Sequence, residues 1–508
     1  MELELNTTRL NCYDPVLDTT IFQEETLESI VPDACPDILR IVDTEAVAFL
    51  KSKEAQEGRA EATGTIRCTV LYEPDGAEGL RRLTVDIPFT CAAEAAGVRS
   101  GCRMVAVPRV QGADARSLNP RKVLARVGLA VELQVFAPQT AEYHSGAICG
   151  EEAGVEQLGE TQPACLITAV EEKPFTFSDD ITLSGSKPAV SEILRTDTEL
   201  LCGESKIIGN KLIFKGEADF QLLYRDGAGE IHTSVFELPF SQIMEVSGVG
   251  EEADLVLRVL TTGCECIPDG EESRTLSLSM NLLAQAVVRE ERQIELLSDA
   301  YSTVYGLTTE RSAYTFYRLL EHSQRRVTVR ELLETMSPVR EVCDVSLGIG
   351  PLSQRREGGQ IVVTVDTEVS VLHRNESGEM AAVRKTIPAS CTIDVPEGAL
   401  CFCRCDCAGE RFASPAGDGA EVRYPLDFHL MLLEPAHTSG VTGIRLHENE
   451  PRNTGAQPSI ILRAVGPGER LWDIAKAYGT TIGDIVQANA LPDEALPMGQ
   501  MLLIPKKR

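Results

Sequence analysis

The feature that most constrains the fold of this chain is an internal repeat with a period of about 150 residues. Each copy carries an apolar run that ends in a ring, and the three rings are Tyr72, Tyr224 and His373. The same landmarks surround each ring in the same order: an earlier proline (Pro36, Pro188, Pro338), a glycine eight residues before the ring in two copies (Gly64, Gly216, replaced by Val365), and a later Pro-Phe pair in two copies (Pro88-Phe89, Pro239-Phe240, replaced by Pro388-Ala389). A pattern that recurs in order predicts one structural unit built three times.

Alternation of apolar and polar residues indicates that the repeated unit is made of strands. About fifty residues beyond each ring, the stretches 123–135, 276–284 and 422–432 place an apolar side chain at every second position. A period of two puts these side chains on one face of a strand. Turn signals between apolar runs, such as Asp226-Gly227, favour hairpins and antiparallel pairing.

The predicted fold class is therefore mainly β, with three repeated antiparallel β-rich modules, sandwiches or barrels, followed by a small C-terminal domain. The modules are assigned to residues 19–140, 165–290 and 306–435, after an N-terminal segment of residues 1–18 and before a linker of residues 436–459. Short helices are also expected near residues 44–55 and 329–335.

Residues 460–506 have a different pattern, which predicts a compact βααβ domain. Residues 460–465 read as a short strand, and a Gly-Pro-Gly turn follows. Apolar residues at helical spacing begin at Leu471, and Gly479 ends that helix as a C-cap residue. A second helix starts at Thr481, with an acidic residue three positions on in a capping-box-like arrangement, and a returning apolar strand closes the domain.

This C-terminal pattern resembles the LysM domain, and the resemblance runs along its whole length. The matching positions are Val465, Pro467-Gly468, Leu471-Trp472, Ile474-Ala475, Tyr478-Gly479, Ile485, Asn489, Leu491, Gly499-Gln500 and Leu503-Ile504-Pro505. The resemblance implies a shallow groove for N-acetylglucosamine-containing glycans, formed by the loop that leads into the first helix and the loop that leaves the second. The binding residues that it implies here are Gly468, Glu469, Arg470, Leu471, Trp472, Asn489, Ala490, Leu491, Pro492 and Asp493.

The loop before the first helix departs from the LysM pattern. LysM domains usually have Gly-Asp-Thr or Gly-Asp-Ser there, whereas this chain has Gly468-Glu469-Arg470. A short Asp or Thr side chain caps a helix, while Glu caps poorly and Arg places a long cation at the mouth of the groove. The substitution favours an acidic or protein ligand over sugar, with simple drift of a surface loop as the other interpretation. Trp472, the single tryptophan, is interpreted as packing rather than as a platform for stacking sugars.

The threefold repeat resembles the SPOCS domain, a spore-coat-associated domain of spore-forming bacteria, over residues 19–435. Repeated SPOCS copies before a C-terminal LysM are similar to the SipL-type family of spore-coat morphogenetic proteins. The resemblance implies a non-enzymatic assembly scaffold in the mother-cell cytoplasm, at the forespore surface and in the spore coat. It also implies that the LysM domain binds the coat-basement morphogenetic ATPase. The alternative is an anchor protein whose LysM domain binds peptidoglycan, an N-acetylglucosamine-containing polymer.

Composition narrows the partners and the compartment. The formal net charge of −29 repels nucleic acid and anionic membrane surfaces. The first residues lack the basic and apolar regions of a secretory signal, and no run approaches the ~18 apolar residues that span a bilayer. The 16 cysteines, in the absence of such a signal, favour free thiols in a reducing compartment. We therefore expect a cytosolic protein with no nucleic-acid partner and no membrane insertion.

The remaining candidates for chemistry are weak. Cys401, Cys403, Cys405 and Cys407 alternate along one stretch, which on a strand puts them on one face about 7 Å apart. Four ligands in a straight row cannot surround one ion, so small apolar residues on an inward face are the favoured interpretation, with a thiol cross-link or a metal as the alternative. The common catalytic motifs do not occur, so a cell-wall hydrolase would lack its catalytic domain, and no enzyme activity or cofactor is expected. His373 replaces tyrosine in its copy and is expected to be structural.

Overall fold

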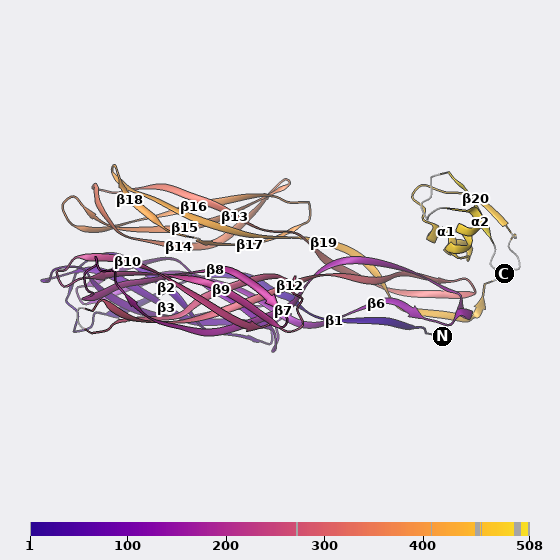
Figure 1. The fold of residues 1–508 in the computed structure, drawn as a ribbon, viewed down its shortest axis with the longest axis horizontal. Helices are drawn as coiled ribbons and strands as arrows, with labels where there is room; N and C mark the ends of the chain where they lie inside the picture. The colour runs from indigo at the N-terminus through magenta and orange to yellow at the C-terminus, as the bar shows by residue number, and fades with distance from the viewer. Residues whose placement is uncertain are drawn as a thin grey trace.

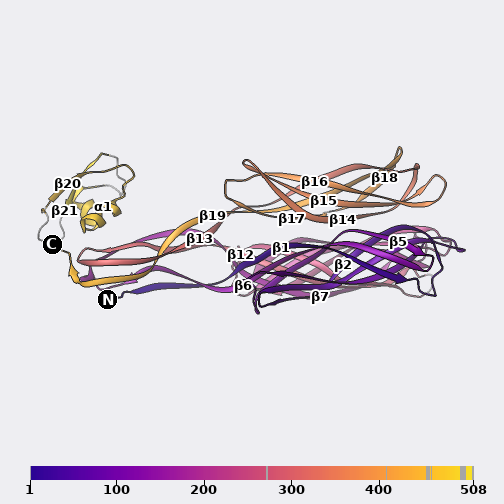
Figure 2. The same ribbon diagram turned by 180° about the vertical axis from the view of Figure 1, so that it is seen from behind.

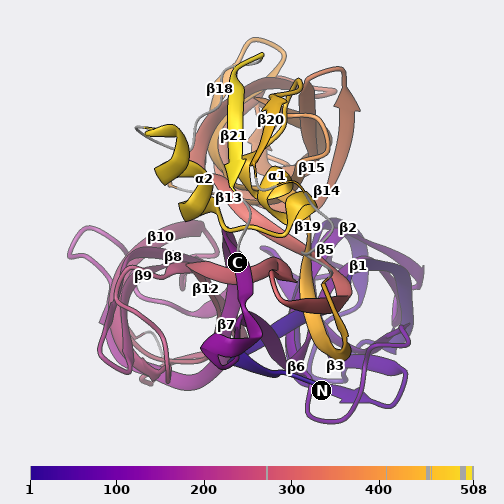
Figure 3. The same cartoon turned by 90° about the vertical axis from the view of Figure 1, so that its right-hand side faces the viewer.

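The computed structural model describes residues 2–270, 273–407, 409–452, 458, 460–491 and 499–505. These residues form three β-rich modules that lie side by side around a common centre, with a small domain at one end (Figure 3). The predicted mainly-β class with three repeated modules is confirmed. In the parts of the chain that the structure describes, neither helix is long and apolar enough to cross a membrane.

The three modules repeat one order of strands, and the fifth strand of the first two modules is divided into two strands in the third. Module 1 contains β1 (Glu4–Ile30), β2 (Ile38–Gln56), β3 (Arg59–Pro74), β4 (Arg81–Glu94), β5 (Arg103–Asn119) and β6 (Lys122–Ile148). A 3-10 helix, η1 (Glu151–Ala153), leads to module 2, with β7 (Val155–Thr182), β8 (Glu192–Ile208), β9 (Lys211–Arg225), β10 (Ile231–Glu245), β11 (Asp254–Pro268) and β12 (Thr275–Ser302). Module 3 contains β13 (Tyr305–Glu334), β14 (Val339–Glu357), β15 (Gln360–Asn375), β16 (Met380–Asp394), β17 (Leu400–Cys407), β18 (Phe412–Ala416) and β19 (Gly419–Pro451).

In each module the first strand pairs antiparallel with the last strand, and the strands between them complete a two-layered unit. In module 1, β1 pairs with β6 from Glu4↔Ile148 to Ile30↔Lys122, and β5 pairs with the other edge of β6. The meander β2-β3-β4 forms the second sheet, and the apolar core lies between the two sheets. Modules 2 and 3 repeat this arrangement, with β7, β12 and β11 and with β13, β19 and β17 in the first sheet.

The alternating stretches of the sequence are the inward faces of the last strands β6, β12 and β19. Their apolar members, from Val123 to Val135, from Leu276 to Ala284 and from Val422 to Leu432, are at most 2% exposed. The predicted single-faced burial is confirmed, because a pleated strand that covers one core must bury every second side chain.

The glycine and phenylalanine landmarks face each other across one strand pair. Gly64 on β3 pairs with Phe89 on β4, and a Cβ built on Gly64 would lie 2.5 Å from the phenyl ring. The ring therefore occupies the space that a side chain at this position would need. In module 3 the same pair is Val365 and Ala389, so the larger side chain has moved to the other strand. The departure of the third copy from the sequence pattern is thus a redistribution of volume within one contact.

The ring and first-proline landmarks also meet. The hydroxyl of Tyr72 donates to the Pro36 carbonyl at 3.2 Å, and Tyr224 donates to the Pro188 carbonyl at 3.1 Å. His373 stands in the same place in module 3, is 3% exposed, and its Nδ1 lies 3.3 Å from the Val371 carbonyl. The imidazole is a buried structural residue, as the sequence predicts.

The expectation of helices near residues 44–55 and 329–335 is wrong, because both stretches are strands. The first lies within β2, where one side packs on the module core and the other lines the boundary with the neighbouring modules. Burial on both faces removes the alternation that would have identified a strand. In the second, Val329 and Leu333 are four residues apart, a spacing that suits one face of a strand as well as of a helix, and pairing with β19 decides between them.

The first and last strands of each module are longer than the module itself. Their outer halves leave the body as three two-stranded ribbons that run side by side toward the C-terminal domain (Figures 1 and 2). We call these ribbons the stalk, which consists of residues 4–15 with 136–148, 155–167 with 289–302, and 305–319 with 433–451.

The stalk has its own apolar core, to which all three ribbons contribute. Tyr143 of the first ribbon lies 5.8 Å from Tyr314 and 5.6 Å from Phe316 of the third, between ring centroids. Ile294 and Leu296 of the second ribbon close the same cluster. Residues 1–18 and 436–451, which the sequence assigned to an N-terminal segment and a linker, therefore contribute strands to the stalk where the structure describes them.

The C-terminal domain has the predicted βααβ order. It consists of β20 (Ile460–Ala464), α1 (Leu471–Tyr478), α2 (Ile482–Asn489) and β21 (Met501–Pro505), and β20 pairs antiparallel with β21. Gly479 ends α1 with φ 67°, a left-handed conformation that favours glycine. Thr481 caps α2 by accepting the Asp484 N–H at 3.0 Å, as the sequence predicts.

Candidate binding sites

The loop before α1 is held by ion pairs within the C-terminal domain. Gly468 makes the turn with φ 70°. The Glu469 carboxylate turns back to accept the Gly466 N–H at 2.9 Å and to pair with Arg463 at 2.5 Å. Arg470 takes the N-cap position but cannot accept a hydrogen bond, and the Asp473 carboxylate accepts from its guanidinium at 3.2 Å and from its N–H at 3.4 Å. Asp473 thus stabilises the start of the helix in place of the usual short cap residue, and the bonds from Arg470 lower the pKa of Asp473.

The loop after α2 is tied to the returning strand by Asn489. Its amide group donates to the Ile485 carbonyl at 2.8 Å and to the Leu503 carbonyl at 2.7 Å, while its oxygen accepts the Leu503 N–H at 2.7 Å. Ala490 follows with φ 47°, and Leu491 packs on the domain core. The predicted binding residues Pro492 and Asp493 lie outside the described residues.

The face of α1 that carries Trp472 packs against the tip of the stalk. The indole N–H of Trp472 donates to Asp299 Oδ2 at 2.8 Å, and its ring meets Tyr301 edge-on with centroids 4.9 Å apart. Trp472 is only 3% exposed, and Leu471 beside it is 2% exposed in the domain core. The interpretation of Trp472 as packing is therefore confirmed, although it packs on Tyr301 of the stalk as well as on the core of its own domain.

Polar contacts complete this docking. Lys476 Nζ lies 2.7 Å from Asp299 Oδ2, and the Tyr301 hydroxyl donates to the Thr480 carbonyl at 2.7 Å. Arg470 reaches Glu160 of the stalk at 3.7 Å. Burial raises the pKa of Asp299, but the bonds from Lys476 and Trp472 outweigh it, and the net result is a lowered pKa.

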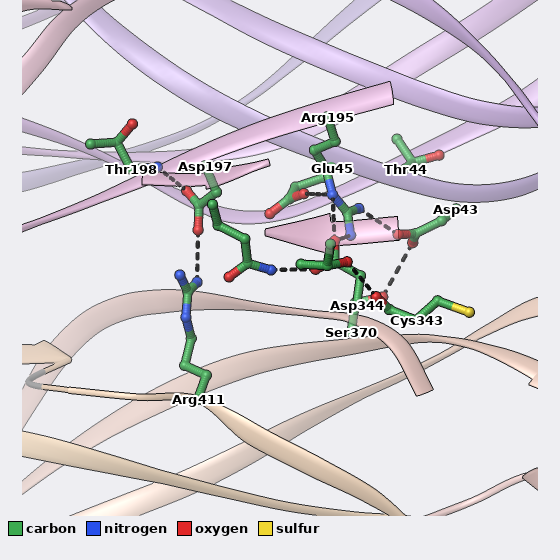
Figure 4. A network of polar contacts seen from close by, with 12 residues as sticks. Asp43, Thr44, Glu45, Arg195, Asp197, Thr198, Cys343, Asp344, Ser370 and Arg411 are labelled. Carbon is green, nitrogen blue, oxygen red and sulfur yellow. Dashed lines mark hydrogen bonds and ion pairs between the residues drawn. The ribbon is translucent and has the colours of Figure 1, made fainter. Parts of the chain in front are cut away.

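A second polar centre lies where the three modules meet (Figure 4). Asp43, Arg195 and Asp344 follow the same bulge in β2, β8 and β14, so they are equivalent residues of the three modules. Arg195 pairs with Asp43 at 2.7 Å and also with Asp344. All three side chains are at most 5% exposed. Burial raises the pKa of Asp43, but Arg195 and Arg384 more than offset it, so that this carboxyl stays ionised.

Further charges extend this centre, and Glu45, Arg195 and Glu199 border a cavity of about 590 Å³ between the modules. Glu45 lies 2.7 Å from Arg195, and Arg411 of module 3 pairs with Asp197 of module 2 at 2.7 Å. Burial raises the pKa of Glu45 and of Glu199 to about 7. The centre therefore joins all three modules through buried ion pairs, and it carries more carboxylates than its arginines neutralise.

Comparison with known families finds matches in the first two modules and in the C-terminal domain. A family model described as SipL, SPOCS domain, matches residues 37–117 and 189–266, and a LysM domain model matches residues 464–505. The chain thus contains two segments similar to the SPOCS domain and one segment similar to the LysM domain. No curated protein matches it. The two SPOCS matches cover β2 to β5 and β8 to β11, the strands that lie between the long first and last strands of modules 1 and 2.

Module 3 has the strand order of the two matched SPOCS modules, and its cysteine row lies in its core. Cys405 and Cys407 are 1% and 4% exposed, and Cys401 and Cys403 pack against the same core. Burial raises the pKa of Cys401 to about 11 and that of Cys405 to about 12, which keeps both as neutral thiols. The favoured interpretation, small apolar residues on an inward face, fits this placement.

The structure places the predicted LysM residues at two points of the domain. Glu469 and Arg470 directly precede α1, Leu471 and Trp472 form its first turn, and Asn489 to Leu491 lie at the end of α2. Sequence reasoning missed Asp299 and Tyr301, because nothing local marks them as contacts of a domain some 175 residues away.

The buried charged centre between the SPOCS modules was also missed, although a signal exists. Asp43, Arg195 and Asp344 each stand 29 residues before the ring landmark of their own copy. Alignment of the three copies on those rings would have revealed one position that is acidic, basic and acidic in turn. Three copies of the same charge would repel one another at that point, so a change of sign there is a mark of direct contact.

Proposed function

We propose that the protein is a non-enzymatic assembly scaffold of the spore envelope, which uses its LysM domain to bind a coat morphogenetic partner at the forespore surface. Both of its domain types are non-catalytic binding domains, and the SPOCS domain belongs to sporulation proteins. The observation that carries the proposal is the placement of the LysM domain at the end of the stalk, away from the body (Figure 1). A body held together by buried ion pairs and a separate terminal binding domain suit a protein that connects two assemblies.

The partner that we propose is the coat-basement ATPase that polymerises on the forespore, bound from the mother-cell cytoplasm. The contact residues proposed are Glu469, Arg470, Trp472 and the loop that begins at Asn489. Two features favour a protein ligand over a sugar. The loop before α1 carries paired charges where a glycan-binding LysM has short hydroxyl or carboxylate side chains, and the Asn489 amide is engaged within the domain.

Capture of the purified ATPase by the full chain, compared with a chain that lacks residues 460–508, tests this proposal. We expect the deletion to abolish capture, because it removes the proposed contact residues. The body and stalk retain their own cores without the LysM domain, so the truncated chain should still fold. Arg355→Ala, which changes an exposed arginine on β14, is the matched control and should capture normally. Unimpaired capture by the truncated chain would refute the proposal.

The second candidate function is a peptidoglycan-binding anchor, which the LysM match itself favours. Sedimentation of the full chain with insoluble peptidoglycan separates the two, with the chain that lacks residues 460–508 as the control. Binding that depends on these residues supports the anchor. A full chain that stays in the supernatant while it captures the ATPase excludes it.

A further inference from the structure

We propose that the tip of the stalk masks the partner-binding face of the LysM domain by acting as a built-in ligand. The partner must then compete with the stalk, and it fits this face by presenting a carboxylate beside an aromatic ring. This inference rests on the proposed function, since it concerns the same face that carries Trp472. It adds the regulation of that face and the chemistry of the surface that it accepts.

The stalk offers the LysM domain two groups from one strand. Asp299 and Tyr301 lie on β12, two residues apart, so their side chains leave the same face of the strand. A bulge in the pairing of β12 with β7, between Leu297 and Asp299, directly precedes them. Bulges re-aim the side chains that follow, and here the carboxylate is directed at the helix α1.

The LysM domain binds these two groups with two hydrogen-bond donors and an aromatic ring. The Trp472 N–H and the Lys476 ammonium both reach Asp299, at 2.8 and 2.7 Å from the same Oδ2 atom. The Tyr301 ring covers the indole edge-on, and its hydroxyl reaches the Thr480 carbonyl. Water can bind these donors when the stalk leaves, so a partner binds this face well when it supplies an acceptor in the place of Asp299. A partner surface that presents a carboxylate beside a ring matches the donors and the indole.

Release from the stalk does not require the LysM domain to unfold. Its core includes Val465, Leu471, Ile474, Ile485 and Ile504, all from within the segment that the LysM model matches. The stalk contributes Tyr301 to that core, with Leu158 packed against it, and polar contacts around it. Asp299 also pairs with Arg311 on the stalk at 2.8 Å, so its carboxylate keeps a partner after release. Both separated surfaces therefore remain compatible with a folded chain.

Trp472 is the only tryptophan, so its fluorescence reports on this contact alone. The test uses the full chain with Asp299→Ala and Tyr301→Phe, which removes the carboxylate and the phenol bond but keeps the ring. We expect red-shifted emission, stronger quenching by acrylamide, and tighter capture of the ATPase. If nine-tenths of the wild-type chains are masked, release tightens the apparent affinity about tenfold. The matched control is Glu310→Ala with Tyr317→Phe, a carboxylate and a phenol on the third ribbon of the stalk.

The outcomes separate the masking from the proposed function. A red shift with tighter capture supports both. A red shift with unchanged or weaker capture overturns the masking and leaves the function standing, because the stalk would then only position the domain. Unchanged emission and quenching also overturn the masking, since the indole would not be covered by these groups. Capture by neither chain overturns the proposed function and, with it, the masking of this partner.

Discussion

The centre of the body and the tip of the stalk both join parts of the chain through a carboxylate and a cation. The two contacts differ in how deeply these charged groups are buried. Arg195 lies among Asp43, Glu45 and Asp344 with 5% exposure, and the carboxylates of Asp43 and Asp344 are at most 3% exposed. At the stalk, the Lys476 side chain is 41% exposed, and water can replace either member of its pair with Asp299. Deep burial makes the first contact costly to break, whereas access to water makes the second reversible.

The largest expected effect is at the buried centre. Arg195→Met keeps the length of the side chain but leaves three carboxylates without their shared cation. We expect a loss of about 3–5 kcal/mol in the free energy of unfolding, or failure to fold, because an uncompensated buried charge is costly. Urea denaturation followed by circular dichroism measures it, with Arg355→Ala as the exposed control. A loss below about 1 kcal/mol would break the comparison, since the centre would then behave like the stalk contact.

Ionisation of the same centre predicts that stability depends on pH. The folded pKa of Glu45 and Glu199 is raised to about 7, so between about pH 4.5 and 7 the folded chain holds protons that the unfolded chain has released. Stability from these two groups is therefore lost as the pH rises through 7. The charged and titratable groups that act on the pKa of Glu45 and Glu199 are Asp43, Arg195, Asp197, Asp219, Asp344, Cys407 and Arg411.

We expect Glu45→Gln with Glu199→Gln to remove that loss. From pH 5.5 to 8 the wild type should lose about 1–3 kcal/mol relative to the variant, measured from urea midpoints at each pH. Subtraction of the variant cancels the other titrating groups, including His429, whose pKa is lowered by burial. Parallel pH profiles for the two chains would show that these carboxylates are solvated, as at the stalk.

Overpacking the core of the body is expected to cause a loss of stability of similar or smaller size. A Cβ at Gly64 would lie 2.2 Å from the Phe49 carbonyl oxygen and 2.5 Å from the Phe89 ring. We expect Gly64→Ala to cost about 1–3 kcal/mol, because neither backbone nor ring can move freely inside a filled sandwich. Gly359→Ala, where the added carbon meets open space, is the matched control in thermal unfolding. Equal unfolding temperatures for the two variants would mean that the body yields more readily than its burial indicates.

The smallest effect on stability is expected in the LysM domain. Arg470 is 59% exposed in its pairs with Asp473 and Glu160, and exposed pairs of this kind contribute little. Arg470→Ala should change the free energy of unfolding by no more than about 0.5 kcal/mol while it weakens capture of the ATPase. A stability change as large as that of Gly64→Ala would show that the stalk contact is a structural joint.

The amino-acid sequence by itself determined the strands that face the cores, the threefold repeat and the βααβ order of the LysM domain. These follow from local regularities, such as the period-two run from Val123 to Val135 and the caps at Gly479 and Thr481, which need no distant partner to act. The ring, proline and glycine landmarks belong to the same class, because each pairs within its own module.

Only the tertiary structure decided how the copies meet. The stalk pairs strands across more than a hundred residues, and its ribbons, polar on their outer sides, have a core only when three lie together. The charges of Asp43, Arg195 and Asp344 cannot be explained from any one copy, since each is balanced by residues of the other copies. Trp472 likewise looked like a residue of one small domain, and a carboxylate 173 residues earlier in the chain determines how it is covered. Contacts between copies depend on which surfaces the fold brings together, and no local pattern encodes that.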